Sequence, residues 1–274
     1  MVKILAFTLI LALGIAWIAI VISLLFSTNY VYQFLPLEKV EAMLAMINLF
    51  VLIGVPILYF ILFILKIVYR TSVKAGWKIA MSVLWLLSLG SLGLIANKVV
   101  KEHQSEAKIT TRTPIPGFPF DTIMIDFEKD PDEYIVHLDN AVKINKTTLA
   151  MDRIRLLIRE SDDENFQWGT SFKARGATPE TAAEYAEQIN FDLRLEGNHI
   201  VIPNYIYLRN GQKWHDQKVF VTVWIPKDKY ILLTKDVRWH HATFDIKGDA
   251  SKLWHSDSDL WKMENGGLVN VRLD

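Results

Sequence analysis

Ile4–Phe26 reads ILAFTLILALGIAWIAIVISLLF, a run of 23 residues without a charged side chain. A helix rises about 1.5 Å per residue, so about 20 residues cross the hydrocarbon core of a bilayer. Fifteen of the 23 residues are Leu, Ile, Phe or Val, which favour insertion at the membrane centre. The run therefore predicts a transmembrane helix. Because Phe26–Asn29 offers no small-residue cleavage site, we expect this helix to remain as an anchor.

Two further spans are predicted at Met43–Leu65 and Gly76–Ala96, which makes residues 1–100 a three-helix transmembrane region. The first of them contains Pro56, which should kink the helix or mark a packing contact. The second is less apolar, and its small residues are Ser82, Ser88, Gly90, Ser91 and Gly93. Small residues let helices approach closely in lipid. They either pack against the other spans or are simply tolerated there.

Basic residues in the loops predict the orientation of the spans. The loop between the second and third spans carries four basic residues and no acid, whereas the preceding loop has Lys39 against Glu38 and Glu41. Basic loops stay in the cytoplasm. We therefore expect a multi-pass protein of the cell inner (cytoplasmic) membrane, with a cytoplasmic N-terminus and an extracytoplasmic C-terminal domain. Apart from Lys78 at the start of the third span, where it continues the basic loop, no charged residue lies inside a span, which disfavours a transporter or a channel.

The formal net charge of the 274 residues is 0, but it divides unevenly along the chain. Residues 1–103 carry eight basic and three acidic side chains, whereas residues 104–274 carry 22 basic and 27 acidic ones. No segment has the basic surface that a nucleic-acid-binding protein needs. The sequence has no cysteine, which excludes disulfides, Cys-bound zinc and thiol catalysis.

The part of the chain after the third span changes character. Residues 101–119 are polar and contain three prolines in Pro114–Pro119, so they predict an extended linker. Residues 120–274 then alternate apolar and polar side chains in short runs such as Arg153–Arg159 and Lys218–Ile225. The second of these runs predicts a strand that is buried on both faces.

One short helix is predicted within this region. It begins after the N-cap Thr178, has Pro179 at its first position and ends near Gln188. Many short strands with one short helix are typical of an all-β fold. The predicted fold class is therefore a membrane α region of three transmembrane helices plus an all-β extracytoplasmic domain, built of stacked or sandwich-like short strands.

The residues that could carry chemistry form no recognisable set. Trp239-His240-His241 and the segment His255–Asp259 contain potential metal ligands, but adjacent histidines on a strand point to opposite faces. A solvated strand and turn are the better interpretation. No catalytic or phosphate-binding motif occurs in the β-rich part of the chain. We therefore expect no enzyme activity, no metal and no cofactor.

Two sets of residues are candidates for contact with a partner or a ligand. Arg153, Arg155 and Arg159 share one face of a strand and suit an anionic lipid headgroup or a partner, with a hydrated surface as the alternative. Aromatic residues crowd the last 61 residues of the chain. Most should lie in the core, but a minority such as Trp214, Trp239 and Trp254 could form a flat surface for a glycan or a protein.

Several short motifs carry a resemblance to a known family. They are Ala174-Arg-Gly-Ala177, Gly211-Gln-Lys-Trp214, Val223-Trp-Ile-Pro226 and Trp261-Lys-Met263. With the three spans, they resemble the C-terminal half of bacterial PspC-type membrane proteins, in which a LiaF-like transmembrane region precedes a toastrack β domain. Proteins of this type usually carry a separate PspC domain ahead of the spans. Interactions of that domain are not assigned to this chain.

The resemblance implies a non-enzymatic membrane protein of envelope stress sensing or signalling that acts by protein–protein contact. The expected partners are the lipid bilayer and other membrane proteins that meet its transmembrane helices, with a homo-oligomer as a further option and no nucleic acid. The alternative is a membrane-anchored module for cell-wall glycan binding or adhesion. An enzyme ranks third, because the sequence offers no triad or metal set.

Overall fold

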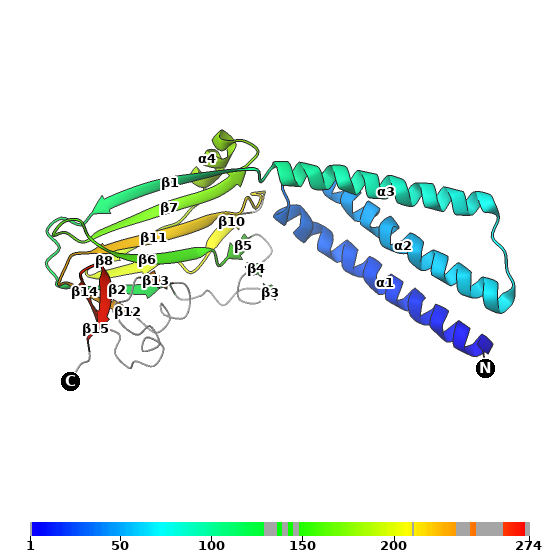
Figure 1. Cartoon of the computed structure of the whole chain (residues 1–274), viewed down its shortest axis with the longest axis horizontal. Coiled ribbons are helices and arrows are strands. Elements are labelled where there is room, and N and C mark those ends of the chain that lie inside the picture. Colours follow the sequence, from blue (N-terminus) through cyan, green and yellow to red (C-terminus); the bar gives the residue numbers. More distant parts are fainter. Residues whose placement is uncertain are drawn as a thin grey trace. The chain divides into compact units, whose positions relative to one another are not determined.

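The computed structural model describes residues 2–128, 136–138, 142–144, 148–209, 211–233, 242–244 and 260–271. The chain forms two compact units, Met1–Glu102 and His103–Asp274 (Figure 1). The first unit is helical and the second consists mostly of strands.

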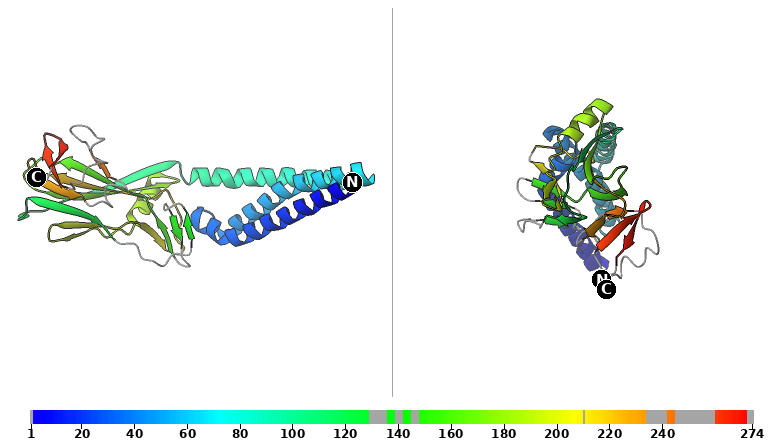
Figure 2. Two further views of the ribbon diagram at one scale, coloured as in Figure 1. Left: turned by 90° about the horizontal axis from the view of Figure 1, so that it is seen from below. Right: turned by 90° about the vertical axis from the view of Figure 1, so that its left-hand side faces the viewer.

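The first unit contains three long helices, α1 (Val2–Phe34), α2 (Lys39–Tyr69) and α3 (Ala75–Lys101). By length and composition, all three could cross a membrane. Helix α2 packs against both α1 and α3 (Figure 2). The Nζ atom of Lys98 near the end of α3 lies 2.6 Å from a carboxylate oxygen of Glu41, which joins that end of α3 to the first turn of α2.

Polar side chains also connect α2 and α3. The Asn48 amide donates to the Ser91 hydroxyl oxygen at 2.7 Å, and the Tyr59 hydroxyl lies 2.8 Å from that of Ser82. Hydrocarbon supplies no hydrogen bonds, so such groups need protein partners inside a membrane. Gly90 and Gly93, in contrast to these serines, make no contact with α2. Apart from their own helix, no described atom lies within 4 Å of the position that a Cβ would take at either glycine. Of the small residues in α3, serines therefore face the helix interface while these two glycines face away from it.

The second unit contains three sheets (Figure 1). The first sheet has the strand order β1 (Ser105–Pro114), β7 (Gln167–Gly176), β11 (Lys218–Ile225), β6 (Ile154–Glu160), β13 (Ala242–Phe244). The second has the order β10 (Ile206–Arg209), β5 (Thr148–Met151), β4 (Val142–Ile144), β3 (Val136–Leu138). The third has the order β15 (Gly267–Asn270), β14 (Leu260–Glu264), β12 (Tyr230–Leu233), β2 (Thr122–Phe127), β9 (His199–Ile202), β8 (Arg194–Glu196).

A single apolar cluster joins the five-stranded and six-stranded sheets. On β11 it includes Val219, Val221 and Val223, all of which are fully buried. Ile123 on β2 and Ile231 on β12 are equally buried and belong to the same cluster. Burial of apolar side chains on this scale is the main contribution to the stability of the unit.

The short helix α4 (Pro179–Glu187) lies where the sequence predicts it. The Thr178 hydroxyl accepts a hydrogen bond from the backbone N–H of Thr181, which satisfies a free donor of the first turn. Ala182 and Ala186 are fully buried, and α4 packs on β7 and β1. Gly176 permits this approach, since a Cβ there would lie 2.6 Å from the backbone nitrogen of Ala182.

One sequence prediction was wrong, because ten residues of the expected linker 101–119 form a strand. β1 pairs with β7 in antiparallel register from Ser105–Gly176 to Pro114–Gln167. β1 is an edge strand, and an edge tolerates polar residues and a proline that a central strand would not. The same composition is typical of linkers, so the sequence could not separate the two.

Helix packing in the first unit can be tested at Gly54. A Cβ at this position would lie 2.6 Å from the Trp17 ring, so Gly54→Ala should separate α1 from α2 and lower the free energy of unfolding by about 1–3 kcal/mol. Unfolding of the full chain in mild detergent measures this difference.

The matched control is Gly90→Ala, because a Cβ there meets no atom within 4 Å. Both substitutions gain the same intrinsic helix preference, about 1 kcal/mol. We expect the control to be neutral or slightly stabilising. Equal effects of the two substitutions would show that Trp17 does not pack on Gly54.

Candidate functional site

Among the described ranges, no group of three or more His, Asp or Glu side chains is placed to hold a metal ion. His240, His241 and the segment His255–Asp259 lie outside the described residues, as do Trp239 and Trp254. The sites that the structure does describe are surfaces and cavities.

The three predicted arginines lie at and before β6. Arg153, Arg155 and Arg159 are exposed, and the intervening Ile154 and Ile158 are buried. Strand alternation therefore presents the arginine side chains on the side opposite to the apolar cluster. Arg155 is in register with Phe220 of the neighbouring β11, and Arg159 with Trp224.

Two cations from β1 reach the same aromatic side chains from the other side. The Nζ atom of Lys108 lies 5.7 Å from the centre of the Phe220 ring. The guanidinium carbon of Arg112 lies 4.4 Å from the centre of the Trp224 ring. Both distances are typical of cation–π contacts. We call this surface the outer face, and it consists of Lys108, Arg112, Arg155, Arg159, Phe220 and Trp224.

Gly169 on β7 makes the contact between Arg112 and Trp224 sterically feasible. β7 lies between β1 and β11, and a Cβ at Gly169 would lie 3.0 Å from a ring atom of Trp224. The indole therefore extends across β7 towards β1. Arg112 is held further by the side-chain oxygen of Gln167, to which its Nε donates, and by Asp162 at 3.5 Å.

Sequence reasoning missed Phe220 and Trp224 as surface residues. The alternation in Lys218–Ile225 places them on one side of a strand, but that side was expected to be buried. In the structure the valine side is buried, whereas Phe220 and Trp224 are half-buried. The sequence assigned Lys108 and Arg112 to a linker, but in the structure they belong to β1. They lie over the two rings and cover part of each.

Trp214 lies in a different part of the unit. It is half-buried, and its ring centre lies 5.9 Å from that of His103. The next residue, His215, is only 5 % exposed and stacks on Tyr185 with ring centres 3.7 Å apart. A cavity of about 200 Å³ adjoins this stack and is also lined by Ile206, Lys213 and Gln217.

Burial in the first place, and the neighbouring His103 and Lys213 in addition, lower the pKa of His215 from 6.5 to about 4. The imidazole is therefore neutral at pH 7. Its Nδ1 atom is buried and has no hydrogen-bond partner among the described residues.

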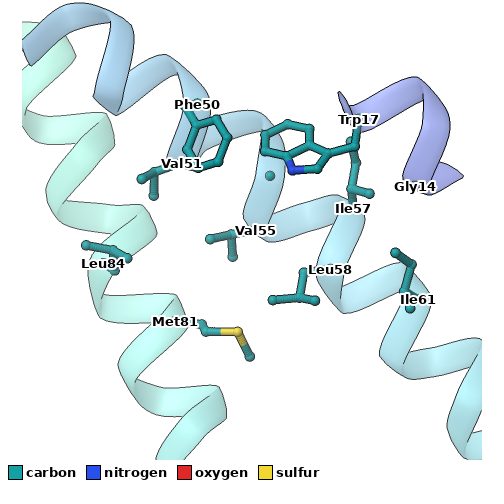
Figure 3. Close-up of a pocket in the computed structure, with 11 residues that line it drawn as sticks. Gly14, Trp17, Phe50, Val51, Val55, Ile57, Leu58, Ile61, Met81 and Leu84 are labelled. Carbon is teal, nitrogen blue, oxygen red and sulfur yellow. The ribbon is translucent and has the colours of Figure 1, made fainter. Parts of the chain in front are cut away.

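A second cavity, of about 310 Å³, lies among the three helices of the first unit (Figure 3). Trp17 and Phe50 lie at one end of it with ring centres 4.7 Å apart. Val55, Leu58 and Met81 point into the same space (Figure 3). Its lining contains no charged residue, so it suits an acyl chain or an apolar side chain of another helix.

The buried imidazole gives the second unit a defined response to acid. Between pH 6.5 and about 4 the unfolded chain takes up a proton that folded His215 does not, so stability falls as the pH drops through this range. A shift of one pKa unit corresponds to about 1.4 kcal/mol, which makes the expected loss about 3 kcal/mol. Unfolding of the full chain at pH 7 and pH 4 measures it.

His215→Gln removes this titration and should reduce the loss of stability between pH 7 and pH 4. His199→Gln is the control, because His199 is half-exposed and lies 3.0 Å from a carboxylate oxygen of Asp126. The control should retain most of the acid sensitivity. An unchanged pH dependence in His215→Gln would contradict the role of His215.

Comparison with known proteins bears on the second unit. Residues 142–270 match the family model described as the ToastRack found in some PspC proteins. No curated protein and no solved structure matches the chain. The matched residues run from β4 to β15. The strands β1, β2 and β3 precede them in the sequence but belong to the same sheets. The resemblance seen in the sequence is thus confirmed: three apolar helices precede a toast-rack domain of the PspC C-terminal type, which is the arrangement of a LiaF-like transmembrane region followed by a toastrack domain.

Proposed function

We propose that this chain is a non-enzymatic membrane protein of envelope stress sensing or signalling, and that it acts through protein–protein contact. The toast-rack match supports the stress role at the level of the family. Charged residues are absent from the central parts of the three predicted spans, which supports an anchor or a contact surface rather than an ion pathway.

The observation that carries the proposed contact is the outward surface of α3. Gly90 and Gly93 are exposed, and apart from their own helix no described atom lies within 4 Å of the position that a Cβ would take. Exposed leucines alone are expected of any helix in lipid, but small residues let a second helix approach closely. Leu87 and Leu94 flank the glycines and are 66 % and 75 % exposed. This surface suits a helix of another membrane protein or of a second copy.

The proposed orientation follows from charge. Four basic residues lie in or next to the loop between the C-terminal end of α2 and the N-terminal end of α3: Lys66, Arg70, Lys74 and Lys78. A cytoplasmic position for this basic loop leaves the toast-rack domain outside the cytoplasm. There it would sample the envelope, while the helices would meet their partner within the membrane.

The helix contact can be tested with a photo-reactive amino acid at Leu94 of the full chain in intact cells. We expect crosslinks to a membrane protein, and we expect the double substitution Gly90→Leu and Gly93→Leu to reduce them at least tenfold. The double variant should still fold, because both positions are open within the unit.

Ile18→Phe on α1 serves as the matched control, since it enlarges an exposed apolar side chain away from α3. It should leave the crosslinks intact. Crosslinks that persist in the double variant would contradict a contact through the small residues of α3.

A second candidate function, binding of an envelope polymer, is favoured by the outer face of the toast-rack domain. Its cations and half-buried rings lie on a sheet surface that faces away from the apolar cluster.

A further inference from the structure

The outer face repeats one arrangement twice. In each repeat a ring on β11 lies between a cation from β1 and a cation from β6. The two sets are Lys108, Phe220, Arg155 and Arg112, Trp224, Arg159. We call them the two rungs.

The rungs are regularly spaced, because corresponding members are four residues apart on each strand. β1 and β11 are both antiparallel to β7, and β11 is parallel to β6, so all three strands run in the same direction. At about 3.3 Å per residue, the rungs lie about 13 Å apart along the strands. A linear ligand aligned with the strands would meet the same arrangement twice.

Positive charge is concentrated at the rungs. Among the described residues, Lys108 and Arg159 form no ion pair, whereas Arg112 pairs at 3.5 Å with Asp162, whose side chain is 87 % exposed, and lies near Asp163. Two lysines on this side of the sheet are paired with acids: Lys173 pairs with Glu106, and Lys218 pairs with Asp216. Residues 104–274 as a whole carry more acids than bases. A basic surface on an acidic part of the chain points to an anionic ligand.

The two rings hold the cations in place, and the cations in turn cover part of each ring. Arg112 lies over Trp224 and Lys108 over Phe220, so a neutral sugar has little free ring surface to stack on. Anchoring on a ring reduces the side-chain freedom that a cation loses when it binds an anion. Three of the four cations are arginines, whose planar group binds phosphate or carboxylate with two hydrogen bonds.

The exposed residue between the rungs is Thr110, whose hydroxyl oxygen lies 2.9 Å from that of the buried Ser171. Thr222 on β11 is also buried, and Leu157 beside it on β6 is half-buried. Protein–protein interfaces usually have an exposed apolar centre, whereas the exposed side chain at this centre carries a hydroxyl group. None of the cavities described above includes a rung residue, so the surface suits an extended ligand rather than a small molecule in a pocket.

We infer that the outer face binds a linear phosphate-bearing polymer of polyol or sugar units. The polymer lies along the strands, its phosphates bind the cations of the two rungs, and its hydroxyl groups contact the exposed Thr110 between them. This binding is separate from the helix contact of α3, so either can fail without the other.

The absence of cysteine from the sequence permits a site-specific test. Thr110→Cys places a fluorophore on the outer face, and Thr113→Cys places it on the same strand but on the opposite face, with both positions exposed. The full chain in nanodiscs of zwitterionic lipid is titrated with a synthetic poly(glycerol phosphate). We expect a saturable signal change at position 110 and little change at position 113.

Substitution of the rung cations should weaken binding in steps. Arg159→Gln is expected to reduce the affinity at least fivefold, and Arg159→Gln with Lys108→Gln at least twentyfold. Arg194→Gln is the control, because Arg194 is an exposed cation on β8 of another sheet that pairs with Glu128. Unchanged unfolding curves verify that the variants fold. Monomeric glycerol phosphate should bind at least a hundredfold more weakly than the polymer, since it reaches one rung only.

Three results would overturn the inference. One is equal binding by the wild type and the double rung variant, and another is an equal response at positions 110 and 113. The third is equal or tighter binding of poly-glutamate or of phosphatidylglycerol vesicles, which would assign the outer face to an acidic protein or to a lipid surface. Retained crosslinking at Leu94 in the rung variants would show that the helix contact is unaffected.

Discussion

The pairing of β1 with β7 is the interaction on which the organisation of the toast-rack domain depends. β1 begins after only three residues that follow α3, and ten consecutive residue pairs join it to β7. The same pairs bring Lys108 and Arg112 beside the rings of β11. Without this strand, β7 would become the edge of the sheet and the rings would lose half of their cations. One backbone ladder thus both completes the sheet and assembles the outer face.

Strand alternation gives the central strand β11 two different environments. Val219, Val221 and Val223 enter the apolar cluster, while Phe220 and Trp224 lie on the opposite side. The rings remain half-buried because cations from β1 cover them, and Gly169 leaves room for the indole. In the helical unit, small residues are also used in two ways. Gly54 receives the Trp17 ring, whereas a Cβ at Gly90 would meet no described atom outside its own helix within 4 Å.

The sequence was sufficient for features with strong local patterns. Long apolar runs predicted the three helices, period-two alternation predicted the strand-rich unit, and Thr178 with Pro179 predicted α4. Features that depend on a partner far along the chain were not predictable. β1 has the polar, proline-containing composition of a linker, and only its pairing with β7 makes it a strand. Once β1 was missed, nothing in Lys218–Ile225 indicated that its aromatic side would stay partly exposed. Of the predicted contact residues, the arginines at β6 lie on the exposed side, and Trp214 lies apart from them beside His103.

Two proposals concern the toast-rack domain itself: its position outside the cytoplasm and the occupation of its outer face by a polymer. Modification of single cysteines by a membrane-impermeant thiol reagent in intact cells tests both proposals most directly. Thr113→Cys should react, and Thr110→Cys should be protected until the envelope polymers are removed. Failure of both cysteines to react, with or without that removal, would place the domain in the cytoplasm, and equally fast reaction of the two in intact cells would show that the outer face is unoccupied.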